Sequence, residues 1–444
     1  MTRRDPAPWR EVLRGNVLAV GVVSLLTDLA SEMMNPLLPL FLAGLAPAGL
    51  APIVLGTMEG VAEATASLLK LVSGRLSDRL GRRKGLVLIG YGLSAMVRPL
   101  MALVSASNHV IGVKFIDRIG KGLRTSPRDA LLGDAAPPSR RALAFSFHRA
   151  MDHTGAVLGP LVAAGLLYAQ LGYSFWRGAS ATPTVDEMSA LRVVFAAALV
   201  PGLVAVAVVL FAVRESPLNP TVKPASGARD VAPPDVAPPD VAPADAVPPL
   251  PRRFYSFVAV AVLFALGNSS DLFLLLYAHE KFALGMPQVL GLWVALHLAK
   301  AAGSLPGGLL ADRIGRRPAI FAGWTLYALC YLGFGAASAL WHIGLLLVAY
   351  GVYYGLTEGA LKAMVTDYTV PAQRATAFGV FHGALGLAAL PASLVFGVLW
   401  ARLGPQAAFS LGAGLAAAAA LGLFMLGRAA RPEMDDAPVA KGIE

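Results

Sequence analysis

Long apolar stretches, separated by short polar connections, follow one another along the whole chain. A helix needs about 20 mostly apolar residues to cross a membrane. Twelve stretches of that kind can be marked, at residues 16–41, 52–76, 86–105, 109–131, 142–170 and 192–213 and at residues 254–279, 287–311, 318–337, 342–366, 376–401 and 405–428. The pattern predicts an all-α membrane protein with twelve transmembrane helices.

A short basic sequence between two of these stretches occurs twice. Residues 74–84 read GRLSDRLGRRK, and residues 308–318 read GLLADRIGRRP. A second match, at nearly the same offset, relates Asp134, Pro138, Arg141, Ala144 and Phe145 to Asp367, Pro371, Arg374, Ala377 and Phe378. Two matches of this kind indicate an internal duplication, so we expect two pseudo-symmetric six-helix bundles.

The duplication divides the chain into four parts. We expect an N-terminal bundle over 1–214, a linker over 215–251, a C-terminal bundle over 252–430 and a tail over 431–444. Residues 230–245 of the linker read DVAPPDVAPPDVAPAD. Dense proline removes hydrogen-bond donors and blocks helix formation, so this linker should be extended and disordered. A tether between the bundles is the simpler interpretation, and a recognition role is the alternative.

Composition and charge support a membrane location. The chain is 56% hydrophobic and only 14% charged, which is more apolar surface than a soluble core of this size could bury. Its net charge of +10 comes from Lys and Arg clustered between the apolar stretches. This arrangement favours insertion in a cell inner membrane with both termini cytoplasmic, and it leaves no basic face for nucleic acid. Four arginines also precede the first stretch. That stretch has full membrane length and no small-residue cleavage site, so we interpret it as a first span and not as a signal peptide.

Several kinds of chemistry have no support in the sequence. Cys330 is the single cysteine, so a disulfide within the chain is impossible. The histidines of the apolar stretches do not cluster, so we expect no metal and no cofactor. No phosphate-binding loop is present, so ATP should not drive the protein directly. An enzyme would have to combine residues such as Ser126, Asp129 and His148 with no supporting pattern, and we expect none.

Ionisable side chains inside the apolar stretches are the strongest functional signal, because each costs several kcal/mol in a membrane unless it faces the protein interior. Asp28 and Glu32 stand four residues apart, as do Glu59 and Glu63. In the fourth stretch a basic ridge runs along one helix face, with Arg118 and Lys121 near its middle. The predicted substrate and proton-coupling residues are Asp28, Glu32, Glu59, Glu63, Arg118, Lys121, Arg149, Asp152, Asp271 and Glu358. We expect Asp28, Glu59, Glu63 or Asp152 to carry the coupling proton with Arg118 as charge partner. A purely structural ion-pair cluster is the alternative.

The second half holds fewer such groups. Asp271 follows Asn268, Ser269 and Ser270, which could bond a ligand. Glu358 and Lys362 are four residues apart, and we expect an internal pair between them in preference to substrate contact.

The repeated turn resembles the signature loop of the major facilitator superfamily, and twelve spans with a central loop extend this resemblance over nearly the whole chain. Arg118-Ile-Gly-Lys121-Gly122-Leu-Arg124 is similar to a second motif of that family. A third, the core of the antiporter motif of proton-coupled exporters, is similar to the packing sequence with Gly155, Gly159 and Pro160.

This resemblance implies two bundles that rock about a central site. Gly74 and Gly308 would allow close helix approach, and Gly81 and Gly315 would permit the tight turns. Asp78 could accept hydrogen bonds from a helix N-terminus of the other bundle, or bond Arg83, and so latch the cytoplasmic side. The expected gate residues are Gly74, Asp78, Arg79, Gly81, Arg82, Arg83, Asp312, Arg313, Gly315 and Arg316.

Together these features predict a proton-coupled secondary transporter of a small polar or charged organic solute. The antiporter-like motif favours export. The alternatives are a proton symporter that imports an organic anion or a siderophore-like chelate, and a transporter-like receptor. We expect a monomer whose partners are the solute, protons and the lipid bilayer.

Overall fold

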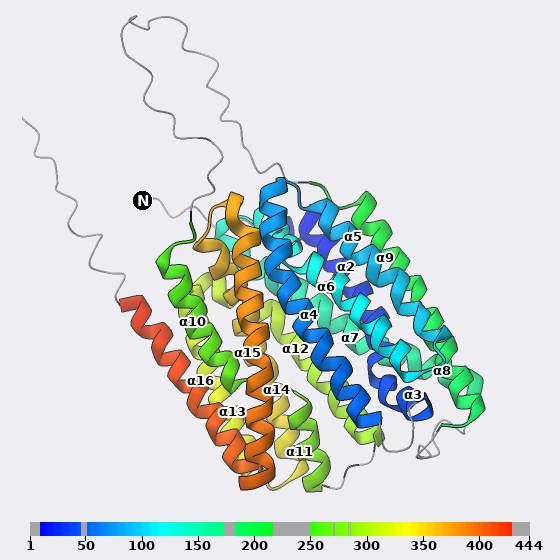
Figure 1. The fold of residues 1–444 in the computed structure, drawn as a ribbon. Helices are drawn as coiled ribbons and strands as arrows, with labels where there is room; N and C mark the ends of the chain where they lie inside the picture. Colours follow the sequence, from blue (N-terminus) through cyan, green and yellow to red (C-terminus); the bar gives the residue numbers. More distant parts are fainter. Residues whose placement is uncertain are drawn as a thin grey trace, which may run out of the picture.

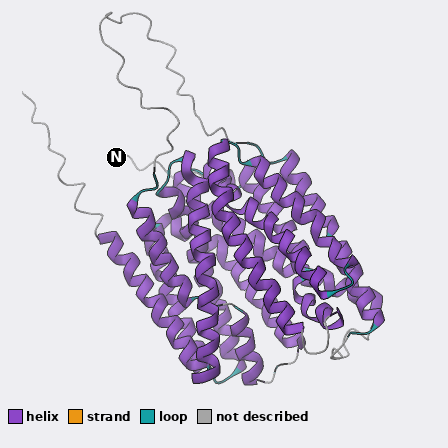
Figure 2. Ribbon diagram, in the orientation of Figure 1, coloured by secondary structure: helices purple, strands orange, loops and turns teal. Residues whose placement is uncertain are grey.

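The computed structural model of the protein describes residues 9–45, 51–172, 183–215, 249–269, 271–282, 284 and 286–428. Within these ranges every regular element is a helix (Figure 2). The first half contains α1 (Trp9–Val12), α2 (Gly15–Glu32), η1 (Asn35–Leu37), α3 (Leu38–Leu45), α4 (Ala51–Leu80), α5 (Lys84–Val97), η2 (Arg98–Leu103), α6 (Ser107–Ala135), η3 (Pro138–Arg140), α7 (Arg141–Leu171), α8 (Val185–Ala197) and α9 (Leu199–Phe211). The second half contains α10 (Arg252–Gly267), α11 (Leu272–Phe282), α12 (Met286–Ile314), α13 (Arg316–Ala336), α14 (Leu340–Asp367), η5 (Pro371–Gln373), α15 (Arg374–Leu403) and α16 (Pro405–Arg428).

Eight helical segments of the described chain are long and apolar enough to cross a membrane. The helices α4, α6 and α12 are of similar length, with 30, 29 and 29 residues, but carry several charged side chains. Such charges lower the mean hydropathy of a helix without shortening it. The protein is therefore an all-helical membrane protein, and the count of twelve spans stays a prediction.

Four of the predicted stretches contain a break in the α-helix, although three of them, 16–41, 86–105 and 192–213, overlap single candidate membrane spans. The stretches 16–41, 86–105 and 192–213 break after Glu32, Val97 and Ala197. A proline follows each break within four residues, at Pro36, Pro99 and Pro201. Proline removes a backbone donor and clashes with the preceding turn, so the α-helix cannot continue undisturbed there.

The fourth interruption divides the stretch 254–279. Helix α10 ends at Gly267 and α11 begins at Leu272. The hydroxyl of Tyr327 donates to the carbonyl oxygen of Gly267 at 3.0 Å, and that of Tyr331 lies 3.0 Å from the Ser269 hydroxyl. Tyr327 of α13 thus satisfies a backbone carbonyl that the broken helix frees, and Tyr331 bonds the neighbouring Ser269 side chain, which helps to stabilise the break inside the protein.

Two equivalent helix pairs make the largest contacts between the halves. Helix α4 packs along α15, and α12 packs along α7 (Figure 1). The repeat relates α4 to α12 and α7 to α15, so the same contact is made twice. Glycines allow it: a Cβ atom on Gly74 would lie 2.9 Å from the carbonyl carbon of Ala375, and one on Gly308 would lie 3.0 Å from the carbonyl oxygen of Ala142. The backbones meet where any side chain would keep them apart.

Parts of the predicted domain layout lie outside the described residues. These parts include residues 216–248 of the linker, the whole tail over 431–444, and the ends and some loops of both predicted bundles. The extended character of the linker therefore stays a prediction.

Candidate functional site

A polar cavity lies inside the first half, between α2, η1, α3, η2 and α6. Its volume is about 210 Å³. Among its described lining residues three are acidic, namely Asp28, Glu32 and Asp117, and five are basic, namely Arg98, Lys114, Arg118, Lys121 and Arg124. Four predicted site residues, Asp28, Glu32, Arg118 and Lys121, therefore share one cavity. The described lining comes from the first half alone, whereas we expected a site between the halves.

Several charges of this cavity are bonded to neighbours. The Arg98 guanidinium donates to Asp117 at 2.9 Å and to the carbonyl oxygen of Thr27 at 2.9 Å. Asn35 bridges two groups, since it donates to Glu32 at 2.8 Å and accepts from Lys114 at 2.8 Å. These contacts hold α2, η1, η2 and α6 together around the cavity.

Arg124, at the end of the second motif, has a different role. It donates to the Gly90 carbonyl oxygen at 3.1 Å and to the Ser94 hydroxyl at 2.6 Å. Its guanidinium carbon also lies 4.5 Å from the centroid of the Tyr91 ring. Arg124 thus fixes α6 against α5 at the edge of the cavity.

Asp28 and Lys121 face the cavity without such bonds. Among the described residues, none forms a hydrogen bond or ion pair with either side chain. Lys121 still interacts electrostatically with neighbours: Arg118 and Lys70 repel its ammonium, and Glu63 and Asp28 attract it. Asp28 and Lys121 thus influence each other electrostatically, with no direct hydrogen bond or ion pair between them.

The second predicted acidic pair is only partly visible. Glu63 lies 3.4 Å from Lys70, and its side chain is 42% exposed. Glu59 belongs to α4, but its side chain lies outside the described residues. The Glu63 carboxylate therefore does not line the cavity, but it interacts electrostatically with Lys121, which does.

The antiporter-like sequence positions the cavity acids. A Cβ atom on Gly155 would lie 2.9 Å from the Leu29 nitrogen and 3.1 Å from the Asp28 Cβ atom. One on Gly159 would lie 2.8 Å from the Glu32 Cβ atom. Pro160 follows Gly159 inside α7. The motif thus lets α7 approach α2 at the two turns that carry Asp28 and Glu32.

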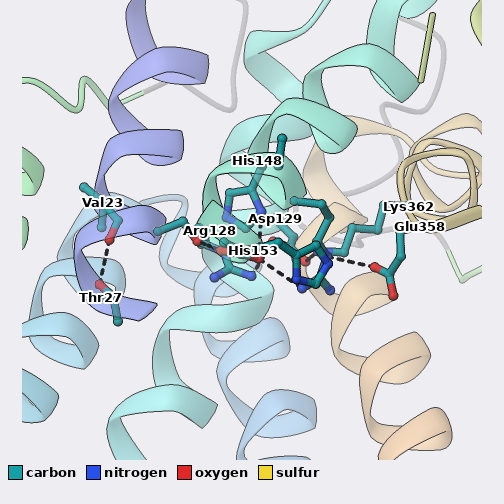
Figure 3. A network of polar contacts seen from close by, with 12 residues as sticks. Val23, Thr27, Arg128, Asp129, His148, His153, Glu358 and Lys362 are labelled. Atoms are coloured by element: carbon teal, nitrogen blue, oxygen red, sulfur yellow. Dashed lines mark hydrogen bonds and ion pairs between the residues drawn. The ribbon is translucent and has the colours of Figure 1, made fainter. Parts of the chain in front are cut away.

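A second polar cluster lies where the halves meet (Figure 3). Asp129 of α6 is its centre and is fully buried. Its carboxylate bonds Arg128 of the same helix at 2.9 Å, Lys362 of α14 at 2.9 Å and His382 of α15 at 2.8 Å. One carboxylate therefore ties a first-half helix to two second-half helices.

Arg149 and Asp152 of α7 belong to the same region. Arg149 bonds Asp152 at 3.0 Å and Glu358 of α14 at 2.8 Å. Ser24 of α2 donates to Asp152, and Asp152 interacts electrostatically with Asp28. A chain of charged side chains therefore leads from the cavity through Asp28 and Asp152 to the ion pair between the halves.

The expected pair between Glu358 and Lys362 is not the contact that these side chains make. Glu358 bonds Arg149, and Lys362 bonds Asp129. Each finds a partner in the other half because both side chains of α14 face the first half.

Asp271 has its own surroundings in the second half. It forms an ion pair with Lys300 and accepts a hydrogen bond from the Tyr350 hydroxyl at 2.9 Å. The Lys300 nitrogen also lies 3.8 Å from the centroid of the Tyr354 ring. Nearby, the Nδ1 atoms of His153 and His297 lie 3.2 Å apart and join α7 to α12. Asp271 and Glu358 thus stand apart from the first-half cavity.

The two basic turns lie at one end of the molecule, the upper end in Figure 1, which we call the motif end. Asp78 accepts hydrogen bonds from the backbone nitrogens of Ala375 and Thr376 at 3.2 and 2.6 Å. Asp312 accepts from those of Ala142 and Leu143 at 3.2 and 2.9 Å. Each carboxylate meets the positive N-terminus of a helix of the other half.

Arginines complete the closure of this end. Arg83 and Arg374 both bond Asp134, while Arg141 and Arg316 both bond Asp367. Burial lowers the pKa of the Arg83 guanidinium from its usual value, although Asp134 and Asp78 oppose that shift. Gly81 and Gly315 have φ angles of 62° and 95°, which the tight turns need. Arg79, Arg82 and Arg313 are exposed.

Sequence reasoning did not select several residues that hold these clusters. They are Arg98, Asp129, Asp134, Lys362, Asp367, Arg374 and His382. Arg98, Asp129, Lys362 and His382 carry the signal that selected Asp28, an ionisable group inside an apolar stretch. Asp134, Asp367 and Arg374 appeared in the internal repeat, which marked them without giving a role.

Comparison with known proteins gives the family. The sequence model of the Major Facilitator Superfamily matches residues 20–297 and 284–442. The uncharacterized MFS-type transporter MJ1317 of Methanocaldococcus jannaschii is 30% identical over 411 residues, which cover 91% of this chain and 93% of that protein. An uncharacterized protein of Mycobacterium tuberculosis, Rv2265, is 28% identical over 404 residues, which cover 90% of this chain and 88% of that protein.

Solved structures share the fold at low identity. The human organic anion transporter MFSD10 has a TM-score of 0.71 at 20% identity, over 94% of this chain and all of that one. The Escherichia coli fucose:proton symporter FucP has a TM-score of 0.70 at 13% identity, over 93% of this chain and 99% of that one. The family match covers most of the sequence, and the chain belongs to the major facilitator superfamily as a membrane-spanning transporter.

Proposed function

We propose that this transporter moves a small polar or charged organic solute by alternating access and couples the movement to protons. The observation that carries the proposal is the position of Asp28. Its carboxyl faces the cavity, and among the described residues no ion pair holds it. Protonation of Asp28 therefore breaks no bond, whereas protonation of Asp117 or Asp129 would break an ion pair.

The surroundings of Asp28 link a proton to the solute. Asp152, Glu32, Lys121 and Arg98 interact electrostatically with its carboxyl. A solute that binds Lys121 weakens the attraction of its ammonium for the Asp28 carboxylate, and the affinity of Asp28 for a proton rises as a result. Arg149 then connects Asp152 to Glu358, so the charge on α2 is felt at the contact between the halves.

The closed motif end supports alternating access. Under the positive-inside topology this end is cytoplasmic, in a cell inner membrane with cytoplasmic termini. The bonds of Asp78, Asp312 and the arginines would then break when the cytoplasmic side opens. Separation of α4 from α15 and of α12 from α7 gives the second state.

Export by antiport is the direction that we propose, because α7 carries the antiporter-like glycines at the contact with Asp28 and Glu32. Symport is the second candidate, since FucP shares the fold and is by its title a proton symporter. Proteoliposomes separate the two. Solute accumulation driven by an acidic lumen indicates antiport, and accumulation driven by an acidic exterior indicates symport.

Neutralisation of the acids tests proton coupling. A solute from a thermal-shift screen is loaded into vesicles with a pH-sensitive dye. Asp28→Asn should abolish solute-driven proton movement yet keep solute–solute counterflow, because the binding cations remain. Glu59→Gln, Glu63→Gln and Asp152→Asn are the matched variants. Unchanged coupling in all four variants would rule the mechanism out, and binding without counterflow in the wild type would indicate a receptor.

A further inference from the structure

We infer that the cavity of the first half binds the anionic group of the solute, with the Lys121 ammonium as its principal contact. This inference deepens the proposed function and rests on it, since it assigns a substrate class to the same site. The class is a small organic anion that carries a carboxylate, sulfonate or phosphate group.

The first argument is the balance of charge. The described lining contains five basic and three acidic side chains. Asp117 neutralises Arg98, and Asn35 holds Glu32 and Lys114 through its amide. The described lining therefore carries more positive than negative groups, and proton uptake by Asp28 would increase that surplus by one charge.

The second argument is the state of Lys121. Arg98 and Arg124 have their donors engaged by Asp117, Thr27, Gly90 and Ser94. Among the described residues, by contrast, no hydrogen bond or ion pair occupies the Lys121 ammonium, and its carboxylate neighbours Asp28 and Glu63 act on it only through longer-range attraction. An ammonium in a site of low dielectric needs an anionic partner, and a solute anion can supply one.

The third argument is the size of the cavity and the nature of its lining. A volume of about 210 Å³ admits a solute of several non-hydrogen atoms. Ser31 and Asn35 add polar lining beside the charges, and the apolar lining consists of Met34, Leu38, Met101 and Val113. A charged head with a short apolar body fits this lining.

Thiol chemistry tests the charge preference without knowledge of the solute. Cys330 is the single cysteine and is buried, so a Cys330→Ser background accepts a reporter. Ser31→Cys places that reporter in the lining. We expect a negatively charged sulfonatoethyl methanethiosulfonate to react about tenfold faster than its positively charged trimethylammonioethyl counterpart, because a positive cavity concentrates anions. Both rates are normalised to those at an exposed reporter, Ser139→Cys.

Substitution of Lys121 identifies the contact. Lys121→Met should bring the ratio of the two rates close to one, and Lys121→Arg should keep it. Lys281→Met, at an exposed lysine of α11, is the matched control and should change nothing. Equal normalised rates in the protein that retains Lys121, or a rate ratio that Lys121→Met leaves unchanged, would overturn the inference.

Protection of the reporter gives a measurement that needs no variant of Lys121. Benzoate and benzenesulfonate should slow modification of Ser31→Cys, while neutral benzamide at the same concentration should not. Protection by benzamide alone contradicts the inference. If the anions protect and counterflow is absent, the site stands and the transport proposal fails. If counterflow occurs with neutral or cationic solutes only, transport stands and the anion site fails.

Discussion

Asp78 and Asp312 occupy equivalent places in the two halves, and each carboxylate accepts two backbone hydrogen bonds from the first turn of a helix in the other half. The α15 N-terminus lies against Asp78 and the α7 N-terminus against Asp312. Because the repeat relates both the acids and the helices, one contact is made twice with the partners exchanged. Two such caps close the motif end more tightly than either could alone.

We call the contact of α4 with α15 and that of α12 with α7 the two seams, and the contact of each aspartate with a helix N-terminus a cap. Loss of one cap should loosen both seams. Asp78→Ala removes an anion from the α15 N-terminus, which is worth about 1 kcal/mol. We expect about a fivefold larger open population at the motif end. The reporter is Ser146→Cys in the Cys330→Ser background, since Ser146 is buried against α12 in the other seam.

Asp78→Asn is the matched control, because asparagine keeps one acceptor oxygen for one of the two nitrogens. The Ser146→Cys reporter should therefore react more slowly in the Asp78→Asn variant than in Asp78→Ala. Identical rates for wild type and both variants would show that the caps do not hold this end closed.

Gly74, at the contact of α4 with α15, should tolerate no larger residue. A Cβ atom on Gly74 would lie 2.9 Å from the carbonyl carbon of Ala375, so Gly74→Ala forces α4 away from α15. Overpacking of this kind costs about 1–3 kcal/mol. We expect faster labelling of Ser146→Cys and slower counterflow.

Gly85→Ala provides the control for that substitution. Gly85 also lies in a helix, but a Cβ atom there would have no described neighbour within 4 Å. Alanine should raise helix stability slightly at this site, by about 0.5–1 kcal/mol. A Gly74→Ala protein that behaves like Gly85→Ala would argue against close helix contact as the requirement.

Asp129 should be the most sensitive acid for stability. Asp129→Asn leaves the buried cations Arg128 and Lys362 without their carboxylate, and removal of one partner from a buried ion pair costs about 3–5 kcal/mol. The midpoint of thermal unfolding in detergent should fall clearly. Adding Lys362→Met should restore part of the loss, since it removes one uncompensated charge. A double variant less stable than Asp129→Asn would contradict this account.

Arg149 and Glu358 should be energetically coupled. The two side chains bond across the halves at 2.8 Å. In a double-mutant cycle with Arg149→Met and Glu358→Gln, we expect an interaction energy of about 0.5–3 kcal/mol from thermal unfolding. Glu358→Gln with Lys300→Met is the comparison pair and should give a smaller value. Additive effects in the first cycle would remove the proposed link between Asp152 and the second half.

The sequence was most informative where one helix or one turn decides the outcome. The predicted stretch 405–428 coincides with α16. Gly81 and Gly315 have the positive φ angles that a tight turn between two helices requires. Hydrophobic length and turn chemistry are local properties, so a single sequence contains them.

Partners across the halves could not be predicted in the same way. Helical spacing placed Glu358 and Lys362 on one face of α14 but could not show that Arg149 and Asp129 face them. Arg98 was overlooked because it stands alone in an apolar stretch, with no second charge at helical spacing on the same helix. Its partner Asp117 lies on another helix, and only the packing of α5 and η2 against α6 brings the two together.

The breaks in the helices have a related cause. Proline explains three of them locally, but the end of α10 at Gly267 depends on Tyr327 of α13, which bonds the freed Gly267 carbonyl. A polar sequence can stay helical or unwind according to what surrounds it. That choice belongs to the tertiary structure.

The described lining of the cavity comes from one half only, and this has a consequence for how solute preference can diverge. Recombination between this chain and a relative at the central linker would leave Asp28, Arg118 and Lys121 together on one parent's segment. A hybrid of that kind should inherit the solute range of the parent that donates residues 1–214, while the other parent's segment sets how readily the two bodies separate.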